Sequence, residues 1–217
     1  SWTGTGTPDV GSGSAEFDRG SSSIEALAVD RGQCVYQTPP SECPDFAEPS
    51  PAGDRFCAVS GTFENTEVTF DNSHVWVLNG PVFFGGQDNT GPATLNIEPG
   101  TYIVGASGSD ALVVRRGSQV FADGNRNAPI VVTSATDVIP DTPDPVPGDV
   151  GGFAIFGNAP SNNCTTNPDP CDAAFEGFPG EQFGGDNPDD SSGIVRFFQV
   201  RYAGNPIVQD QELNAFT

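Results

Sequence analysis

The sequence predicts an all-β fold, a parallel β-solenoid with an irregular N-terminal cap. Between residues 93 and 134, apolar runs alternate with turn signals such as Pro99-Gly100 and Asp123-Gly124. Each run has about three to five residues, which is too short for a helix and typical of a strand. The chain is not patterned as a meander, because no two-residue Asn-Gly or Asp-Gly hairpin joins neighbouring runs with the symmetric alternation that a meander needs. We therefore expect it to turn a corner every few residues and to keep winding.

The composition is that of a turn-rich, strongly acidic chain. Its 217 residues include 27 Gly and 20 Pro, and only 35% are hydrophobic. The net charge is −21, and all eight basic residues are Arg. Such a surface repels nucleic acid and anionic membranes and attracts divalent cations. The sequence also lacks a run of about 20 apolar residues, the length that a membrane span needs.

The five cysteines predict disulfides and therefore an extracellular protein. Cys164 and Cys171 bracket a polar, Pro-rich loop and are expected to pair, and two of Cys34, Cys43 and Cys57 are expected to form a second bridge. The remaining thiol is either free or joins two chains. Disulfides persist outside the cytoplasm, and a chain without Met at its start is expected to be a mature secreted protein.

The pattern divides the chain into two parts. Residues 1–60 are predicted to form a Gly/Ser-rich arm and a Cys-containing cap, because an uncapped first coil exposes its core and its strand edges. Residues 61–217 are predicted to form the solenoid, interrupted by Pro/Asp-rich loop excursions at 135–150 and 159–191. The first of these is expected to protrude, because its prolines forbid regular strand pairing. The expected strands are 66–70, 74–78, 81–84, 95–97, 102–104, 111–114, 119–121, 129–132, 151–158 and a pair within 193–203.

Aromatic residues on these strands are candidates for sugar binding. If Val75 and Val77 face the core, Trp76 lies on the opposite face. There it either packs under the cap or forms an exposed platform for a sugar ring. Tyr102 and Tyr202 are the other two candidates for such a platform.

One acidic loop is the best candidate for a metal site. Its oxygen-bearing side chains, with a following Gly turn, suit a hard cation such as Ca²⁺. The candidate ligands are Asp186, Asn187, Asp189 and Asp190. They lack the spacing of an EF-hand, and the alternative is a solvated acidic turn. The loop that carries Asp137, Asp141, Asp144 and Asp149 is a weaker candidate, because its prolines spread the carboxylates apart.

Catalytic chemistry is not favoured. The chain has no Lys to act as a base, and Arg196 and Arg201 are expected on opposite faces of one strand. Arg115-Arg116 is expected to pair with surface carboxylates. A Ser-His-Asp arrangement would have to use Ser73, His74 and Asp71, and strand neighbours point to opposite faces, so it is not expected to assemble.

A family resemblance extends over roughly Thr66 to Thr217. It rests on the ordered strings LNIEPGTYIVG, ALVVRRGSQVFADGNRNAPIVVTS, GGFAIFGNAP, FGGDNPDDSSGIVRFFQVRYAG and ELNAFT. In these the chain resembles secreted bacterial surface proteins and lipoproteins of unassigned function, which are similar to pectin-lyase-like right-handed parallel β-helix proteins. The resemblance implies the fold and supplies no catalytic motif, so it transfers no activity.

We expect an extracellular structural protein that self-associates, as a fibre or matrix subunit without catalytic activity. An open solenoid end exposes backbone donors and acceptors, and a head-to-tail contact that does not close generates a filament. The alternative is a calcium-stiffened β-helix protein that binds or degrades polysaccharide.

Overall fold

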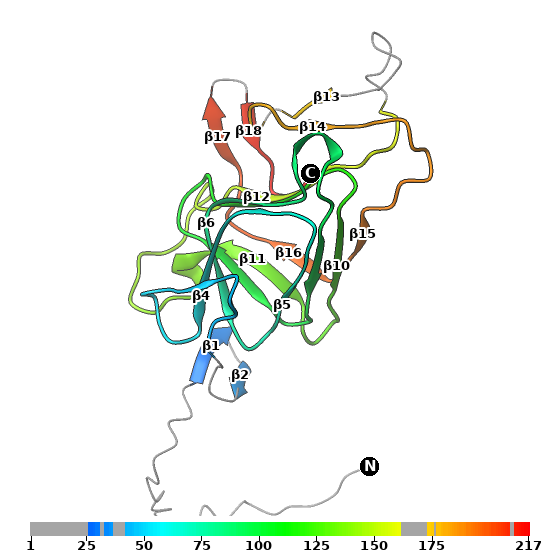
Figure 1. The fold of residues 1–217 in the computed structure, drawn as a ribbon. Coiled ribbons are helices and arrows are strands. Elements are labelled where there is room, and N and C mark those ends of the chain that lie inside the picture. The colour runs from blue at the N-terminus through cyan, green and yellow to red at the C-terminus, as the bar shows by residue number, and fades with distance from the viewer. Residues whose placement is uncertain (1–25, 31–32, 37–41, 162–172, 176, 209–210) are drawn as a thin grey trace, which may run out of the picture. The chain divides into compact units, whose positions relative to one another are not determined.

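The computed structural model describes residues 26–30, 33–36, 42–161, 173–175, 177–208 and 211–217. The chain divides into two compact units, Ser1–Pro39 and Pro40–Thr217. In the first unit, β1 (Ala26–Asp30) and β2 (Gln33–Tyr36) pair antiparallel. The other described strands belong to the second unit (Figure 1). Among the described residues, no helix is both long and apolar enough to cross a membrane.

The second unit is all-β, as the sequence predicts. Its strands are β3 (Glu48–Pro49), β4 (Phe56–Phe63), β5 (Glu67–Phe70), β6 (Val75–Phe84), β7 (Thr94–Ile97), β8 (Tyr102–Gly105), β9 (Ala111–Val114), β10 (Gln119–Asp123), β11 (Ile130–Ser134), β12 (Gly152–Ile155), β13 (Ala173–Ala174), β14 (Gln182–Phe183), β15 (Gly193–Arg196), β16 (Phe198–Val200), β17 (Asn205–Val208) and β18 (Gln211–Leu213). The short 3-10 helices η1 (Gln87–Asn89) and η2 (Ala135–Asp137) lie in the connections. The strands expected from the sequence between residues 66 and 134 are present with small shifts at their ends, except that the two strands expected at 74–78 and 81–84 form one continuous strand, β6.

Two sheets form the body of this unit, and their strands pair parallel except for β3, which is antiparallel to β4. The four-stranded sheet has the order β15-β10-β7-β5, and the eight-stranded sheet has the path β12-β9-β6-β8-β11-β16 with β3 and β4 beside it. The chain passes repeatedly from one sheet to the other, and each return adds a parallel strand next to the previous one. Long strand β6 pairs with β8 through its first half and with β9 through its second. The expectation of parallel strands is confirmed.

Alternation along the strands builds the core. Val68, Leu95 and Val120 align in the register of β5, β7 and β10, and all three are buried. Their strand neighbours point the other way and meet solvent, because successive side chains of a strand face opposite sides. One column of the core therefore stacks apolar side chains from strand to strand.

Trp76 belongs to this core, which corrects its assignment as an exposed sugar platform. The side chain is fully buried, and its ring lies 4.4 Å from the ring of Phe70 and 5.6 Å from that of Phe46. Val75 and Val77 therefore face outward, the reverse of the orientation assumed from the sequence. Of the two alternatives, packing under the cap is the one observed, because Phe46 of the cap segment stacks on the indole. The assumed orientation was wrong because both sides of β6 are apolar, so alternation alone does not say which side is inside.

The two long excursions fold back over the eight-stranded sheet. Val138 and Ile139 from the first excursion pack with a cluster on the outer side of β6 and β8 that includes Val75 and Val104. From the second excursion, Phe175, Phe178 and Phe183 pack with a cluster that includes Val113 and Ala154. The expectation that the first excursion simply protrudes is wrong for Val138 and Ile139. The apolar residues of both excursions bury sheet surface that would otherwise be exposed.

A disulfide joins Cys43 to Cys57, two of the three N-terminal candidates, with an S–S distance of 2.02 Å. The side chain of Cys34 and both Cys164 and Cys171 lie outside the described residues. Strand β4 already pairs parallel with β6, so the parallel sheet begins before residue 61. Phe46, from the cap segment before β4, stacks on Trp76.

The two strands expected within residues 193–203 are present, but they belong to different sheets and the chain bends between them. Strand β15 joins the four-stranded sheet and β16 the eight-stranded one, with Phe197 between them at φ 48°. This left-handed backbone is rare for a bulky residue. The placement of Arg196 and Arg201 on opposite faces of one strand is therefore wrong, because continuous alternation ends at Phe197.

Candidate functional site

The outward surface of the four-stranded sheet is the candidate site, and we call it the open face. In contrast to the eight-stranded sheet, the described residues contain no apolar cluster that covers this surface. Its side chains come from β5, β7, β10 and β15, which lie side by side (Figure 1). They are Glu67, Thr69, Thr94, Asn96, Gln119, Phe121, Asp123, Ile194 and Arg196, joined by Glu98 just after β7.

Register sets the order of these side chains. Thr69, Asn96, Phe121 and Ile194 occupy one row across the four strands, because the strands pair residue by residue in parallel. Phe121 is 36% exposed and Ile194 44% exposed. Large apolar side chains next to each other at the surface mark an interaction site more often than single ones do.

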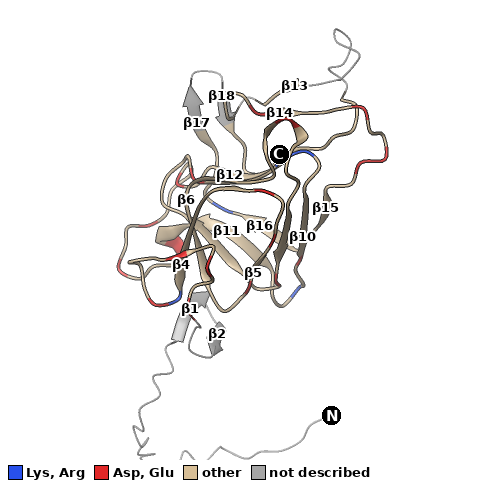
Figure 2. Cartoon of the chain, viewed as in Figure 1, with Lys and Arg blue, Asp and Glu red and all other residues tan. Residues whose placement is uncertain are grey.

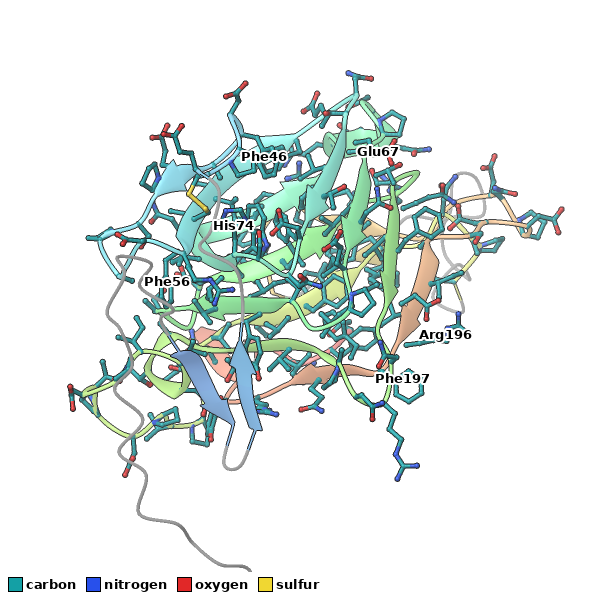
Figure 3. The ribbon with its side chains drawn as sticks, turned by 90° about the horizontal axis from the view of Figure 1, so that it is seen from below. Phe46, Phe56, Glu67, His74, Arg196 and Phe197 are labelled. Atoms are coloured by element: carbon teal, nitrogen blue, oxygen red, sulfur yellow. A yellow bond between two sulfur atoms is a disulfide. The ribbon has the colours of Figure 1, made fainter. Side chains whose placement is uncertain are left out.

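Polar contacts hold the open face in place. The amide Nδ2 of Asn96 donates to Glu67 Oε1 at 2.7 Å, which links β7 to β5. The guanidinium of Arg196 pairs with the carboxylate of Asp123 through two hydrogen bonds between β15 and β10. Figure 3 shows Glu67 and Arg196 toward opposite ends of the sheet. The face thus offers amides, carboxylates and one aromatic ring on a surface whose order is set by the strand register.

A buried polar cluster lies near one end of the open face. Arg115 Nε donates to Glu181 Oε2 at 2.8 Å, and Arg115 Nη2 donates to Glu181 Oε1 at 2.6 Å. Arg115 Nη1 also donates to the carbonyl of Gly85 at 3.0 Å, and the guanidinium carbon lies 3.9 Å from the ring centre of Phe83. The pairing expected for this arginine exists, but the carboxylate is buried and not at the surface.

A shallow pocket opens beside this cluster. Its lining residues are Gly86, Gln87, Asp88, Asn89, Arg115, Arg116, Gly180, Glu181 and Gln182. Asp88 and Asn89 have left-handed backbones, and Arg116 Nη1 donates to the carbonyl of Gly184 at 2.9 Å. The charged groups of Arg115 and Glu181 already satisfy one another. We therefore assign the pair to the attachment of the second excursion and not to ligand binding.

Asp71, Ser73 and His74 come together, contrary to the expectation from strand alternation. Ser73 Oγ donates to Asp71 Oδ1 at 2.7 Å, and His74 Nδ1 lies 2.8 Å from the same oxygen. The expectation failed because β6 begins only at Val75, so all three residues lie in a turn. The histidine is buried and the serine binds the carboxylate directly, so the trio fixes this turn and does not present a nucleophile.

Asp71 makes the stability of the protein depend on pH. Burial alone would raise the pKa of its carboxyl, but the hydrogen bonds from Ser73 and His74 outweigh burial, and the pKa lies below its usual value of 3.8. A carboxyl with a lowered pKa in the folded state stabilises the protein above its unfolded-state pKa. That contribution is lost as the pH falls from about 3.8 through the lower folded-state value.

Replacing Asp71 by Asn is therefore expected to cost stability at pH 7 and progressively less in acid. The measurement is urea unfolding of both proteins at a series of pH values between neutrality and about pH 2. The difference in midpoint should narrow below pH 3.8, the usual value for this carboxyl. A difference that stays constant across the series would show that Asp71 does not carry this linkage.

The other predicted site residues are dispersed. Tyr102 is half-buried in the outer cluster on β6 and β8, and Tyr202 is half-buried after β16, so neither joins the open face. In the acidic loop, Asn187 Oδ1 accepts the backbone amide of Asp189 at 3.1 Å, and Asp190 Oδ2 accepts that of Asn158 at 2.8 Å.

The described residues contain no preformed set of side chains for binding a metal ion. There, no group of three or more His, Cys, Asp or Glu side chains is placed to hold a metal ion. The calcium site at Asp186, Asn187, Asp189 and Asp190 stays a prediction.

The parallel sheets and the winding path of the chain define a protein of the parallel β-helix class. Residues 61–217 match the family described as the pectate-lyase like beta helix domain, and the chain belongs to this family. Searches of curated proteins and of solved structures return no match. The resemblance predicted from the ordered strings is thereby confirmed at the level of the β-helix family.

Proposed function

We propose that this protein is an extracellular carbohydrate-binding β-helix module, and that a polysaccharide chain lies on the open face. The observation that carries the proposal is the row of outward side chains on β5, β7, β10 and β15, which no described apolar segment covers. Amide and carboxylate oxygens bind sugar hydroxyls, and an exposed ring such as that of Phe121 packs against the apolar face of a sugar.

The family supports the same reading. Pectate-lyase-like β-helix domains occur in proteins that degrade polysaccharides, and a parallel β-helix presents long, flat surfaces suited to extended chains. Within the part of the chain that the structure describes, the open face has one guanidinium, Arg196, and it is paired with Asp123. The site therefore favours binding without catalysis.

An extracellular location fits the disulfide between Cys43 and Cys57, because such bonds persist in oxidising compartments. The winding strands are proposed to form one continuous solenoid. Calcium in the acidic loop is retained as a proposal, since it would stiffen the segment before β15.

Self-association into a fibre is the second candidate function. It is favoured by exposed apolar side chains near the last strands, where Phe197 is 56% and Phe216 51% exposed. Opposing it, a net charge of −21 makes copies of the chain repel one another. We therefore place it behind glycan binding.

Phe121→Ala is expected to weaken retention of the protein on insoluble polysaccharides by about 5- to 30-fold, since an aromatic contact of this kind contributes about 1–2 kcal/mol. The measurement is a pull-down binding isotherm over a panel of plant, algal and chitinous polysaccharides. Folding of the variant is checked by its urea midpoint.

The matched control is Phe197→Ala, which removes an equally large exposed ring at the bend outside the row. Unchanged retention of Phe197→Ala beside weakened retention of Phe121→Ala supports the proposal. Equal retention of both variants and the parent chain contradicts it.

A further inference from the structure

The charge of the open face restricts which polysaccharide it accepts. Three exposed carboxylates, those of Glu67, Glu98 and Asp123, lie on or next to successive strands of the sheet. The one guanidinium there, Arg196, is already paired with Asp123. Glu98 and Asp123 share one row across the sheet, whereas Glu67 is level with Thr94, four residues or about 13 Å along the strands from that row. The carboxylates therefore lie on both sides of the row that holds Phe121.

The surroundings reinforce this negative potential. Exposed Asp186 and Asp189 lie in the loop that leads into β15, and Asp88 lies in the turn that leads into β7. Figure 2 shows acidic residues along these connections and few basic ones. With a net charge of −21, the field of the whole protein adds to that of these carboxylates and repels polyanions.

An anionic polysaccharide would need more counter-charge than Arg126, an exposed cation in the turn after β10, supplies beside these carboxylates. Protein sites that bind carboxylates or sulfates use free Arg or Lys side chains, or a metal ion that bridges two carboxylates. The chain has no Lys. In the described residues, no cluster of metal-ligating side chains borders the open face.

We propose that the open face binds a polysaccharide that bears protonated amines, such as a chain of unacetylated amino sugars. This inference rests on the proposed glycan-binding function and adds the chemical class of the ligand. Ammonium groups of the polymer pair with Glu67 and Glu98, while the ring of Phe121 packs on a sugar face. Complementary charge accelerates the encounter and selects the ligand.

The test is titration calorimetry of the full chain with three oligosaccharides of equal length at about pH 5.5, where Asp and Glu side chains are ionised. The probes are a glucosamine oligomer with free amines, its N-acetylated counterpart with the same backbone, and a galacturonate oligomer. The amine oligomer is expected to bind at least about tenfold more tightly than the acetylated one, and its affinity should fall with added salt.

Two variants locate the effect. Glu67→Gln keeps an acceptor for Asn96 and removes one charge, and it should weaken only the amine oligomer, by about 2- to 5-fold. Glu48→Gln removes an exposed carboxylate on β3, outside the open face, and should change no affinity.

The outcomes separate the two proposals. Equal or tighter binding of the acetylated or galacturonate oligomer, still weakened by Phe121→Ala, overturns the charge selection and leaves glycan binding intact. If Glu67→Gln and Glu48→Gln weaken binding of the amine oligomer equally, the net charge of the protein and not the open face selects this ligand. That result also overturns the inference. Absence of binding to any oligomer or polysaccharide overturns both proposals.

Discussion

Glu181→Gln is expected to lower the free energy of unfolding by about 3–5 kcal/mol. The carboxylate accepts two hydrogen bonds from Arg115 inside the protein, and the variant leaves the guanidinium buried without a counter-charge. A buried charge without its partner is far more costly than the pair itself was favourable. Chemical denaturation followed by circular dichroism at neutral pH measures the loss.

Two further variants separate this charge effect from general damage. The double variant Arg115→Met/Glu181→Met should lose less stability than Glu181→Gln, because it removes both buried charges together. Asp123→Asn breaks the exposed pair with Arg196 and should leave the unfolding midpoint nearly unchanged, because surface pairs contribute little. A double variant that is as unstable as the single one would contradict the explanation.

Trp76→Ala is expected to lower the free energy of unfolding by about 3–5 kcal/mol, the range for large aromatic residues in a packed core. The indole is fully buried in contact with the rings of Phe70 and Phe46, and its Nε1 donates to the carbonyl of Asp71 at 2.9 Å. The substitution empties this space and leaves a buried carbonyl without its donor. Urea unfolding with far-ultraviolet circular dichroism measures the change.

Phe197→Ala is the matched control, since it truncates an aromatic side chain that is 56% exposed. Its stability should remain within about 0.5 kcal/mol of the parent, as for most surface substitutions. If Trp76→Ala unfolds at the same urea concentration as the parent chain, the assignment of this residue to the core is wrong.

These variants also keep stability apart from recognition. Trp76 and Glu181 act through burial, whereas Phe121 and Glu67 lie on a surface whose backbone is held by the parallel sheet. A loss of glycan binding in Trp76→Ala would therefore report unfolding. Only variants of the open face whose urea midpoint is unchanged report on the ligand.

The pattern of apolar runs and turn residues along the sequence predicted the positions of most strands. Short β-branched runs between Pro and Gly turns fix the extended backbone, and absence of hairpin turns favours parallel pairing, so the all-β class follows from neighbouring residues alone. The open face was also within reach of the sequence. Polar residues alternate with Val68 and Phe70 in β5 and with Leu95 and Ile97 in β7, and alignment of these runs brings Asn96 beside Glu67.

By itself, the sequence determined an acidic, turn-rich chain of short parallel strands with an N-terminal disulfide. The tertiary structure alone decided which side is inside in strands that are apolar on both sides, such as β6. Trp76 is buried because the cap brings Phe46 onto it, and Arg115 is buried because the second excursion brings Glu181 to it. These contacts join residues that are distant in sequence. The burial of a side chain depends on which other segment packs on its strand, and the pattern of residues within the strand does not predict that segment.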